Sequence, residues 1–231
     1  MRQIEHIVEP DRLLLSWQTA SERMRMFVAE LIRSGDDANL VYLKESEDFL
    51  KAQSLEFEDY PGFAIENDVH KNVLTSFMKR LPPRSRRDFG RFLDALRIKF
   101  EAEISNFALL GYSGAKLPDD DFTVIHPFEN ASPPFELLLP VQGYRHYYKD
   151  QLPLADLSTD MQAGFEAEPN NPKDPEAIKI IINDVKVGYV SRGLTGSFHE
   201  WMQAGLAISA YVERINGKEQ NPEIYLYVSV K

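Results

Sequence analysis

Residues 168–180, EPNNPKDPEAIKI, and residues 187–192, VGYVSR, are the most informative segments for the fold of the C-terminal part of this chain. Proline fixes φ, and Asn and Asp side chains bond nearby backbone amides, so three prolines around two adjacent asparagines predict a rigid turn. The turn leads into an apolar run that is typical of a strand. Asp174 is therefore expected on the turn, at the entrance of that strand.

Short strands are expected on both sides of this turn, because aromatic and β-branched residues form runs separated by Pro, Asn, Asp and Gly. The predicted elements are strands at 177–182, 185–190, 206–215 and 223–230, a two-residue turn at Asn183-Asp184, and a helix at 194–204 followed by Gly205 as its C′ residue. Gly188 is expected where one backbone approaches another closely. One helix among many short strands favours a small closed or half-closed barrel.

This passage resembles the signature of the HIRAN domain family, E-P-x-N-x-x-D-x-x-A-I followed by a strand that ends V-G-Y. Several polar and turn residues match at fixed spacing, and the resemblance covers about residues 141–231. It includes Gly143–Tyr147, which is similar to the aromatic and basic first strand of the family. The resemblance implies an OB-like β-barrel with an accompanying helix that binds DNA, notably single-stranded ends. The family is found fused to helicase, nuclease and fork-remodelling enzymes.

The resemblance also implies a set of DNA-binding residues. They are Arg145, His146 and Tyr147, with Tyr148 beside them, then Asp174, Tyr189 and Arg192, and Lys173 by its proximity to Asp174. Aromatic side chains can stack on bases while cations hold the backbone of a single strand. Asp174 would accept a terminal 3′-hydroxyl and repel a phosphate, so it would confer end preference more than affinity. Two other interpretations stay open: Asp174 as a turn cap only, and Tyr147 and Tyr189 as core side chains with solvated hydroxyls.

The composition of the 231 residues narrows the function classes. The formal charge is 26 − 36 = −10, and residues 141–231 carry nine Lys or Arg against twelve Asp or Glu, which argues against non-specific coating of nucleic acid. The absence of cysteine excludes disulfides, Cys-ligated zinc and a thiol nucleophile. No apolar run approaches the roughly 20 residues of a membrane span. We therefore expect a soluble, most simply cytoplasmic, protein.

No motif of the sequence predicts catalysis. The P-loop, G-x-G-x-x-G, G-x-S-x-G and H-E-x-x-H patterns do not occur, and the five histidines are scattered. The run Asp119-Asp120-Asp121 could attract a divalent cation, but a solvated loop is favoured because such a site needs more ligands spread over a folded loop. We therefore predict no enzymatic activity, no cofactor and no metal.

The first 135 residues predict a separate domain of strands and helices. Strands are expected near 13–17, 24–33, 40–43 and 122–125, helices at 74–81 and 89–103 with Ser85 as N-cap of the second, and a loop at 111–121. Four prolines at 126–140 favour a domain boundary there. The fold class is thus α+β, with domains at 1–135 and 141–231.

Residues 79–99 have a charge of 8 − 2 = +6, which predicts either a solvated basic helix face or a docking surface for nucleic acid or an acidic partner. The N-terminal part is also faintly similar, around 77–82 and 110–117, to the N-terminal subdomain of HipA-type toxin kinases, without the kinase body. That similarity implies a partner-binding or regulatory module.

Together these features predict a DNA-binding protein that is an accessory to a DNA repair, restriction or defence enzyme, with a helicase, nuclease or toxin-system protein as partner. The alternative is a protein–protein interaction or regulatory module of a toxin–antitoxin or phage-defence system that does not bind DNA directly.

Overall fold

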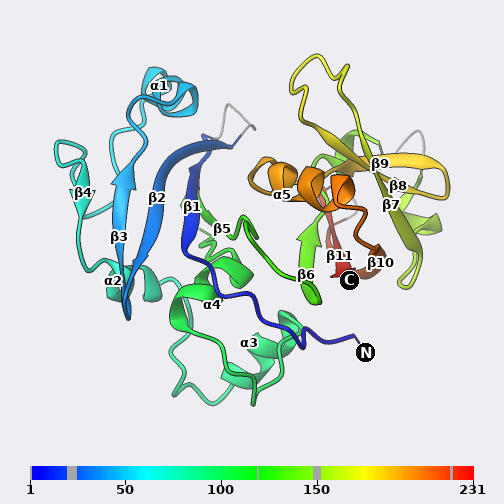
Figure 1. Ribbon diagram of the computed structural model, residues 1–231, viewed down its shortest axis with the longest axis horizontal. Helices are drawn as coiled ribbons and strands as arrows, with labels where there is room; N and C mark the ends of the chain where they lie inside the picture. Colours follow the sequence, from blue (N-terminus) through cyan, green and yellow to red (C-terminus); the bar gives the residue numbers. More distant parts are fainter. Residues whose placement is uncertain (1, 20–24, 119, 148–151, 219–220) are drawn as a thin grey trace. The chain divides into compact units, whose positions relative to one another are not determined.

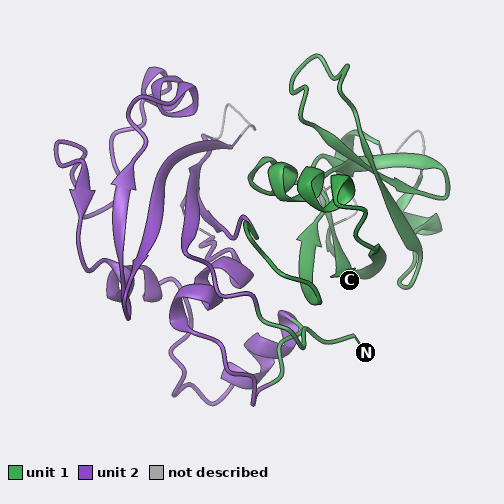
Figure 2. Ribbon diagram, in the orientation of Figure 1, with its two compact units in different colours: residues 1–7, 97–99, 128–231 green, residues 8–96, 100–127 purple. Residues whose placement is uncertain are grey.

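The computed structural model describes residues 2–19, 25–118, 120–147, 152–218 and 221–231, and its contacts divide the chain into two compact units (Figures 1 and 2). The N-terminal unit holds residues 8–96 and 100–127. The C-terminal unit holds residues 128–231 together with two short segments, 1–7 and 97–99. None of the helices in the described residues is both long and apolar enough to span a membrane.

The N-terminal unit is built on a five-stranded antiparallel sheet with strand order β4-β3-β2-β1-β5 (Figure 1). The strands are β1 (Arg12–Trp17), β2 (Met26–Ser34), β3 (Asp37–Tyr42), β4 (Val69–His70) and β5 (Phe122–Ile125). The helices are α1 (Glu47–Ser54), α2 (Leu74–Met78), α3 (Phe89–Ala95) and α4 (Asn106–Ser113). Ser46 and Ser105 begin α1 and α4, because each hydroxyl accepts the backbone N–H three residues on.

Three predictions for this unit were wrong: the end of the helix at 89–103, its N-cap, and the loop at 111–121. The helix expected at 89–103 ends at Ala95, because Arg97 adopts a left-handed φ of 61° and the following residues join the C-terminal unit. Phe100, inside the predicted helix, is 65% exposed. Ser85 does not cap the helix, whose N-cap is Asp88. Part of the predicted loop at 111–121 is instead the end of α4, which terminates at Gly114 with a φ of 73°.

The basic stretch at 79–99 is not one solvated face. The Arg80 side chain is 4% exposed and holds both oxygens of Asp120, at 2.5 and 2.8 Å. Its Nε also donates to the carbonyl of Ala115 at 2.6 Å. Arg80 is therefore a structural ion-pair partner. Asp120, one of the three consecutive aspartates, is already paired with it. Asp119 lies outside the described residues.

The C-terminal unit is a six-stranded antiparallel sheet with order β6-β11-β10-β7-β8-β9, accompanied by helix α5 (Figure 1). The elements are β6 (Phe135–Pro140), η1 (Tyr144–His146), η2 (Leu154–Asp156), β7 (Gln162–Ala167), β8 (Ile178–Ile182), β9 (Val185–Tyr189), α5 (Arg192–Gln203), β10 (Ile208–Lys218) and β11 (Asn221–Val230). Two residues after β6, Gln142 forms an isolated bridge to Tyr189 of β9. The two edges of the sheet therefore meet at one point, although the described strands do not close into a continuous barrel.

Local sequence signals of this unit were confirmed. Asn183 and Asp184 have φ values of 51° and 62°, as a tight two-residue turn between β8 and β9 requires. Gly205 follows α5 with a φ of 69°. The Pro-rich segment also contains strand β6, which pairs with β11, and Pro140 is tolerated as the last residue of that outer strand.

Helix α5 supplies much of the core of this unit. Phe198 and Trp201 are buried, with ring centres 4.8 Å apart, and Trp201 lies 5.0 Å from Phe135 of β6. On the other side Phe198 packs 4.8 Å from Phe165 of β7. These two helix residues therefore belong to the core of the unit.

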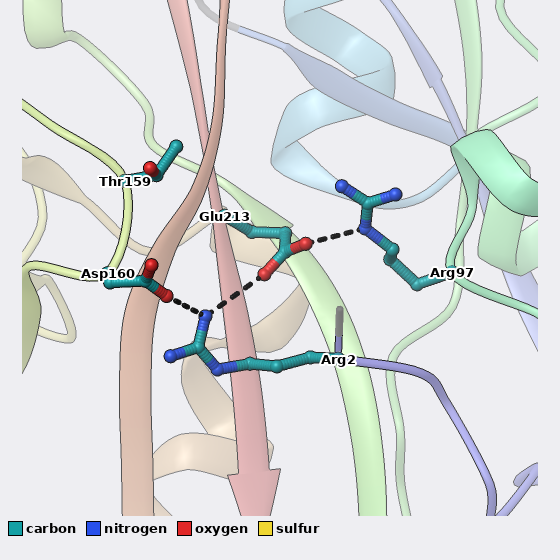
Figure 3. Close-up of a pocket in the computed structure, with 5 residues that line it drawn as sticks. All are labelled: Arg2, Arg97, Thr159, Asp160 and Glu213. Atoms are coloured by element: carbon teal, nitrogen blue, oxygen red, sulfur yellow. Dashed lines mark hydrogen bonds and ion pairs between the residues drawn. The ribbon is translucent and has the colours of Figure 1, made fainter.

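The N-terminal segment is bound to the C-terminal unit by buried carboxylates. Glu136 of β6, 6% exposed, accepts the backbone N–H groups of residues 5 and 6, each at 3.0 Å. Glu213 of β10 receives Arg2 at 3.2 Å and Arg97 at 2.6 Å, around a cavity of about 490 Å³ that is also lined by Thr159 and Asp160 (Figure 3). Because Asp160 also pairs with Arg2, at 2.6 Å, the two guanidinium groups of this cavity are balanced by two carboxylates.

Candidate nucleic-acid interface

A β-bulge in β9 orients the residues of the candidate site. The pairing of β8 with β9 runs Ile180 to Gly188 and then Ile181 to Lys186, so Val187 is an extra residue on β9. In a regular strand, side chains three positions apart point to opposite faces. The extra residue removes that alternation and places Lys186 beside Tyr189.

Gly188 is required at this bulge. Its φ is +155°, and a Cβ there would lie 2.6 Å from Val141 Cγ1 and would also collide with the carbonyl oxygen of Gln142. The missing side chain lets Gln142 and Tyr189 exchange two backbone hydrogen bonds of 2.9 Å. The close backbone approach predicted at Gly188 is therefore confirmed, and it anchors Tyr189.

The hydroxyl of Tyr189 is the centre of a polar network. It donates to Glu168 Oε2 at 2.8 Å and accepts from Lys186 Nζ and Asn171 Nδ2, both at 3.0 Å. A phenol has one proton and two lone pairs, so these three contacts use its full capacity. The hydroxyl of Tyr147 approaches it at 3.4 Å, and the two tyrosine rings lie 6.2 Å apart at 66°.

The same network sets the protonation states. Burial of the Glu168 carboxylate raises its pKa, but hydrogen bonds from Tyr189, Asn171 and Lys186 outweigh burial and leave the pKa below its ordinary value. The hydrogen bond to Tyr189, with that to Glu168, raises the pKa of Lys186. Desolvation is the main cause that raises the pKa of Tyr189 to about 12. At neutral pH the network therefore holds a carboxylate, an ammonium and a neutral phenol.

Asn171 connects this network to the turn that carries Asp174. Its Oδ1 accepts the backbone N–H of Lys173 at 2.9 Å and of Asp174 at 3.3 Å, while its Nδ2 reaches Tyr189. Oδ1 of Asp174 caps the turn by accepting the N–H of Glu176 at 3.0 Å. Oδ2 lies 3.9 Å from Arg192 Nε, and the Asp174 side chain keeps 27% exposure. One oxygen thus stabilises the turn, and the other faces a guanidinium group.

Arg145, His146 and Tyr147 lie in and after a 3-10 turn, η1, rather than on a strand as the resemblance implied. The cause is Gly143, whose φ of 78° turns the chain after β6, so that the N–H of Tyr147 bonds back to the carbonyl of Tyr144 at 2.8 Å. Arg145 is half-buried, with its Nε 3.2 Å from the exposed His146 ring. Tyr148 lies outside the described residues.

Comparison with known proteins identifies this unit. The family model of the HIRAN domain matches residues 137–231. The C-terminal unit contains a HIRAN domain. Among solved structures, the chain is similar to the HIRAN domain of human HLTF, at 23% identity over 41% of this chain and 74% of that chain, with a TM-score of 0.34. A protein from Lactobacillus plantarum is similar at 22% identity over 41% of this chain and 92% of that chain, with the same TM-score. No curated protein matches the chain.

The HIRAN domain brings several of the predicted site residues together. Tyr147 meets Tyr189, Asp174 meets Arg192, and Asn171 connects the two pairs. The side chain of Lys173 is exposed on the turn. Both tyrosine rings are half-buried and their hydroxyls contact each other, so neither is an ordinary core side chain.

Three members of the network were not predicted as site residues: Glu168, Asn171 and Lys186. The first two are the E and N of the quoted signature, so their signal was present in the sequence. Lys186 had none, because its position beside Tyr189 depends on the bulge.

The network brings aromatic rings, cations and carboxylates together in one place, and the family match supports a nucleic-acid-binding role for the HIRAN domain. The connected groups carry no net charge, since Lys186 and Arg192 are balanced by Glu168 and Asp174 (2 − 2 = 0). In the described part of the chain, no group of three or more His, Asp or Glu side chains converges to hold a metal ion.

Proposed function

We propose that this protein binds DNA through its HIRAN domain and recognises a single strand that ends in a free 3′-hydroxyl. The observation that carries this proposal is the second carboxylate oxygen of Asp174. The Asp174 side chain is partly exposed and this oxygen faces Arg192. Asn171 accepts the backbone N–H of Asp174 and also bonds Tyr189, which contacts Tyr147. A fixed carboxylate accepts a hydroxyl and repels a phosphate, while the neighbouring rings and guanidinium suit a base and a backbone phosphate.

We further propose that the protein acts by binding rather than catalysis, in the cytoplasm, as an accessory to a DNA repair, restriction or defence enzyme. The HIRAN match begins at residue 137, so it does not include the N-terminal unit. That unit is therefore proposed to bind a partner protein. A helicase, nuclease or toxin-system protein is the proposed partner class for that unit.

The test is fluorescence anisotropy of short oligonucleotides that end in a 3′-hydroxyl or a 3′-phosphate. Asp174→Asn is the informative variant, because the amide oxygen still accepts the N–H of Glu176 while the charge is lost. We expect wild type to prefer the hydroxyl end, and Asp174→Asn to lose most of that preference while staying folded. Asp174→Ala, which also removes the turn cap, should additionally lower the thermal stability.

Absence of binding to every oligonucleotide at low salt would reject the proposal. That result would leave the protein–protein interaction module as the better interpretation. Genuine phosphate contacts should instead make the logarithm of the affinity fall linearly with the logarithm of salt concentration.

A further inference from the structure

We propose that Glu168 is a specificity-determining residue, which keeps the Lys186–Tyr189 side of the site closed to phosphate and so restricts it to neutral parts of a nucleic acid. This inference rests on the proposed DNA-binding function and deepens it. It assigns to the turn a second, independent source of end preference, separate from Asp174.

Both carboxylate oxygens of Glu168 accept hydrogen bonds from neighbouring side chains. One oxygen accepts Lys186 Nζ at 3.0 Å, and the other accepts Tyr189 at 2.8 Å and Asn171 at 2.7 Å. Its side chain is 26% exposed and that of Lys186 is 27% exposed, so both groups can be reached from solvent. They form an accessible ion pair at the surface of the HIRAN domain.

The ion pair decides which ligand groups the surface accepts. Lys186 is a cation next to two tyrosine rings, with its Nζ 5.2 and 5.0 Å from their centres, and by itself this arrangement would suit a backbone phosphate. Two of its three N–H donors are already directed at Glu168 and Tyr189. A phosphate that approached Lys186 would have to displace the Glu168 carboxylate from Lys186 and would then remain close to that negative charge. A base or sugar carries no charge and meets no such repulsion.

The alternative role for Glu168 is purely structural, as an anchor for Tyr189 and Asn171. The two roles predict different results for Glu168→Gln. The glutamine carbonyl still accepts hydrogen bonds of the network, so a structural anchor would lose only stability. A charge that excludes phosphate would also change which oligonucleotides bind.

Glu166→Gln is the matched control. Glu166 lies two residues earlier, pairs with Lys179 of β8 at 2.8 Å and is 58% exposed. The two variants change the net charge of the domain equally, so any difference between them reports the position of Glu168.

The experiment measures dissociation constants for 3′-hydroxyl and 3′-phosphate oligonucleotides, across a salt series, on the full chain. We expect Glu168→Gln to gain roughly five- to tenfold in affinity for the 3′-phosphate strand, because one partly solvated charge contact is worth about that factor. Its salt dependence should steepen by about 0.7, the slope of one added phosphate contact on a single strand. Glu166→Gln should stay within about twofold of wild type at matched salt. The double variant Glu168→Gln/Lys186→Gln should lose the gain.

The outcomes separate this inference from the proposed function. If wild type binds hydroxyl-ended strands but Glu168→Gln behaves like Glu166→Gln, the role of Glu168 is overturned and DNA binding stands. If wild type binds no strand at low salt, both fall. Should Glu168→Gln fail to fold, Lys186→Gln decides. This variant leaves the Glu168 carboxylate without its cation, so 3′-phosphate affinity should drop more than hydroxyl affinity, and an equal drop refutes the inference.

Discussion

Replacing Gly188 by alanine tests whether the backbone bridge between Gln142 and Tyr189 fixes the position of Tyr189. The new Cβ would lie 2.6 Å from Val141 Cγ1 and 3.3 Å from the carbonyl carbon of Gln142, and it would collide with the carbonyl oxygen. Backbone atoms block the site, so β9 must move away from Gln142 and lose the two bridge hydrogen bonds. These bonds contribute about 0.5–1.5 kcal/mol each. A φ of +155° costs a residue with a side chain about 1–3 kcal/mol more.

The expected loss is therefore about 2–6 kcal/mol in the free energy of unfolding of the C-terminal unit. For a unit of this size, the unfolding midpoint should fall by at least about 8 °C. Urea denaturation measures the loss in the free energy of unfolding. Amide hydrogen exchange at Tyr189 reports whether the bridge hydrogen bonds are lost. The matched control is Gly196→Ala in α5, where an added Cβ meets no atom within 4 Å. That change should stabilise the helix by about 0.5–1 kcal/mol. The bridge does not fix the position of Tyr189 if the free energy of unfolding of Gly188→Ala lies within about 0.5 kcal/mol of wild type and the Tyr189 amide stays protected from exchange.

Three further predictions concern buried or paired charges. Arg80→Met leaves the Asp120 carboxylate without its partner, so the N-terminal unit should lose about 3–5 kcal/mol in urea denaturation; a loss under about 1 kcal/mol would contradict a structural role for the pair. Glu136→Gln should cost about 1–3 kcal/mol and speed hydrogen exchange at the amides of residues 5 and 6, and unchanged exchange there would show that the segment is held by other contacts. Folding lowers the pKa of Glu168 below 4.5, so its stabilisation is present above that pH and is lost as pH falls through the lower folded value. The stability of Glu168→Gln should consequently fall less than that of wild type between about pH 5 and pH 3, and parallel profiles would exclude this contribution.

The differences between prediction and structure follow a physical pattern. The helix at 89–103 was predicted from apolar spacing and a local N-cap, but its end is decided by Ile98, which pairs with Ile4 of the N-terminal segment. The basic run predicted Arg80 to lie on an accessible basic face, solvated or available for docking, but its burial is decided by Asp120, forty positions away. In both cases a partner distant in the sequence overrides the local signal.

Local sequence sets the chemistry of short segments. Proline and asparagine around Asp174, the Asn183-Asp184 turn and the apolar face of α5 act over a few residues, so the HIRAN signature and the strands beside it could be predicted. Local sequence does not specify the bulge that places Lys186 beside Tyr189, the bridge to Gln142, or the ion pair that neutralises Lys186. These features depend on strand register and on which side chains meet across the sheet, and neither is encoded within one segment of the chain.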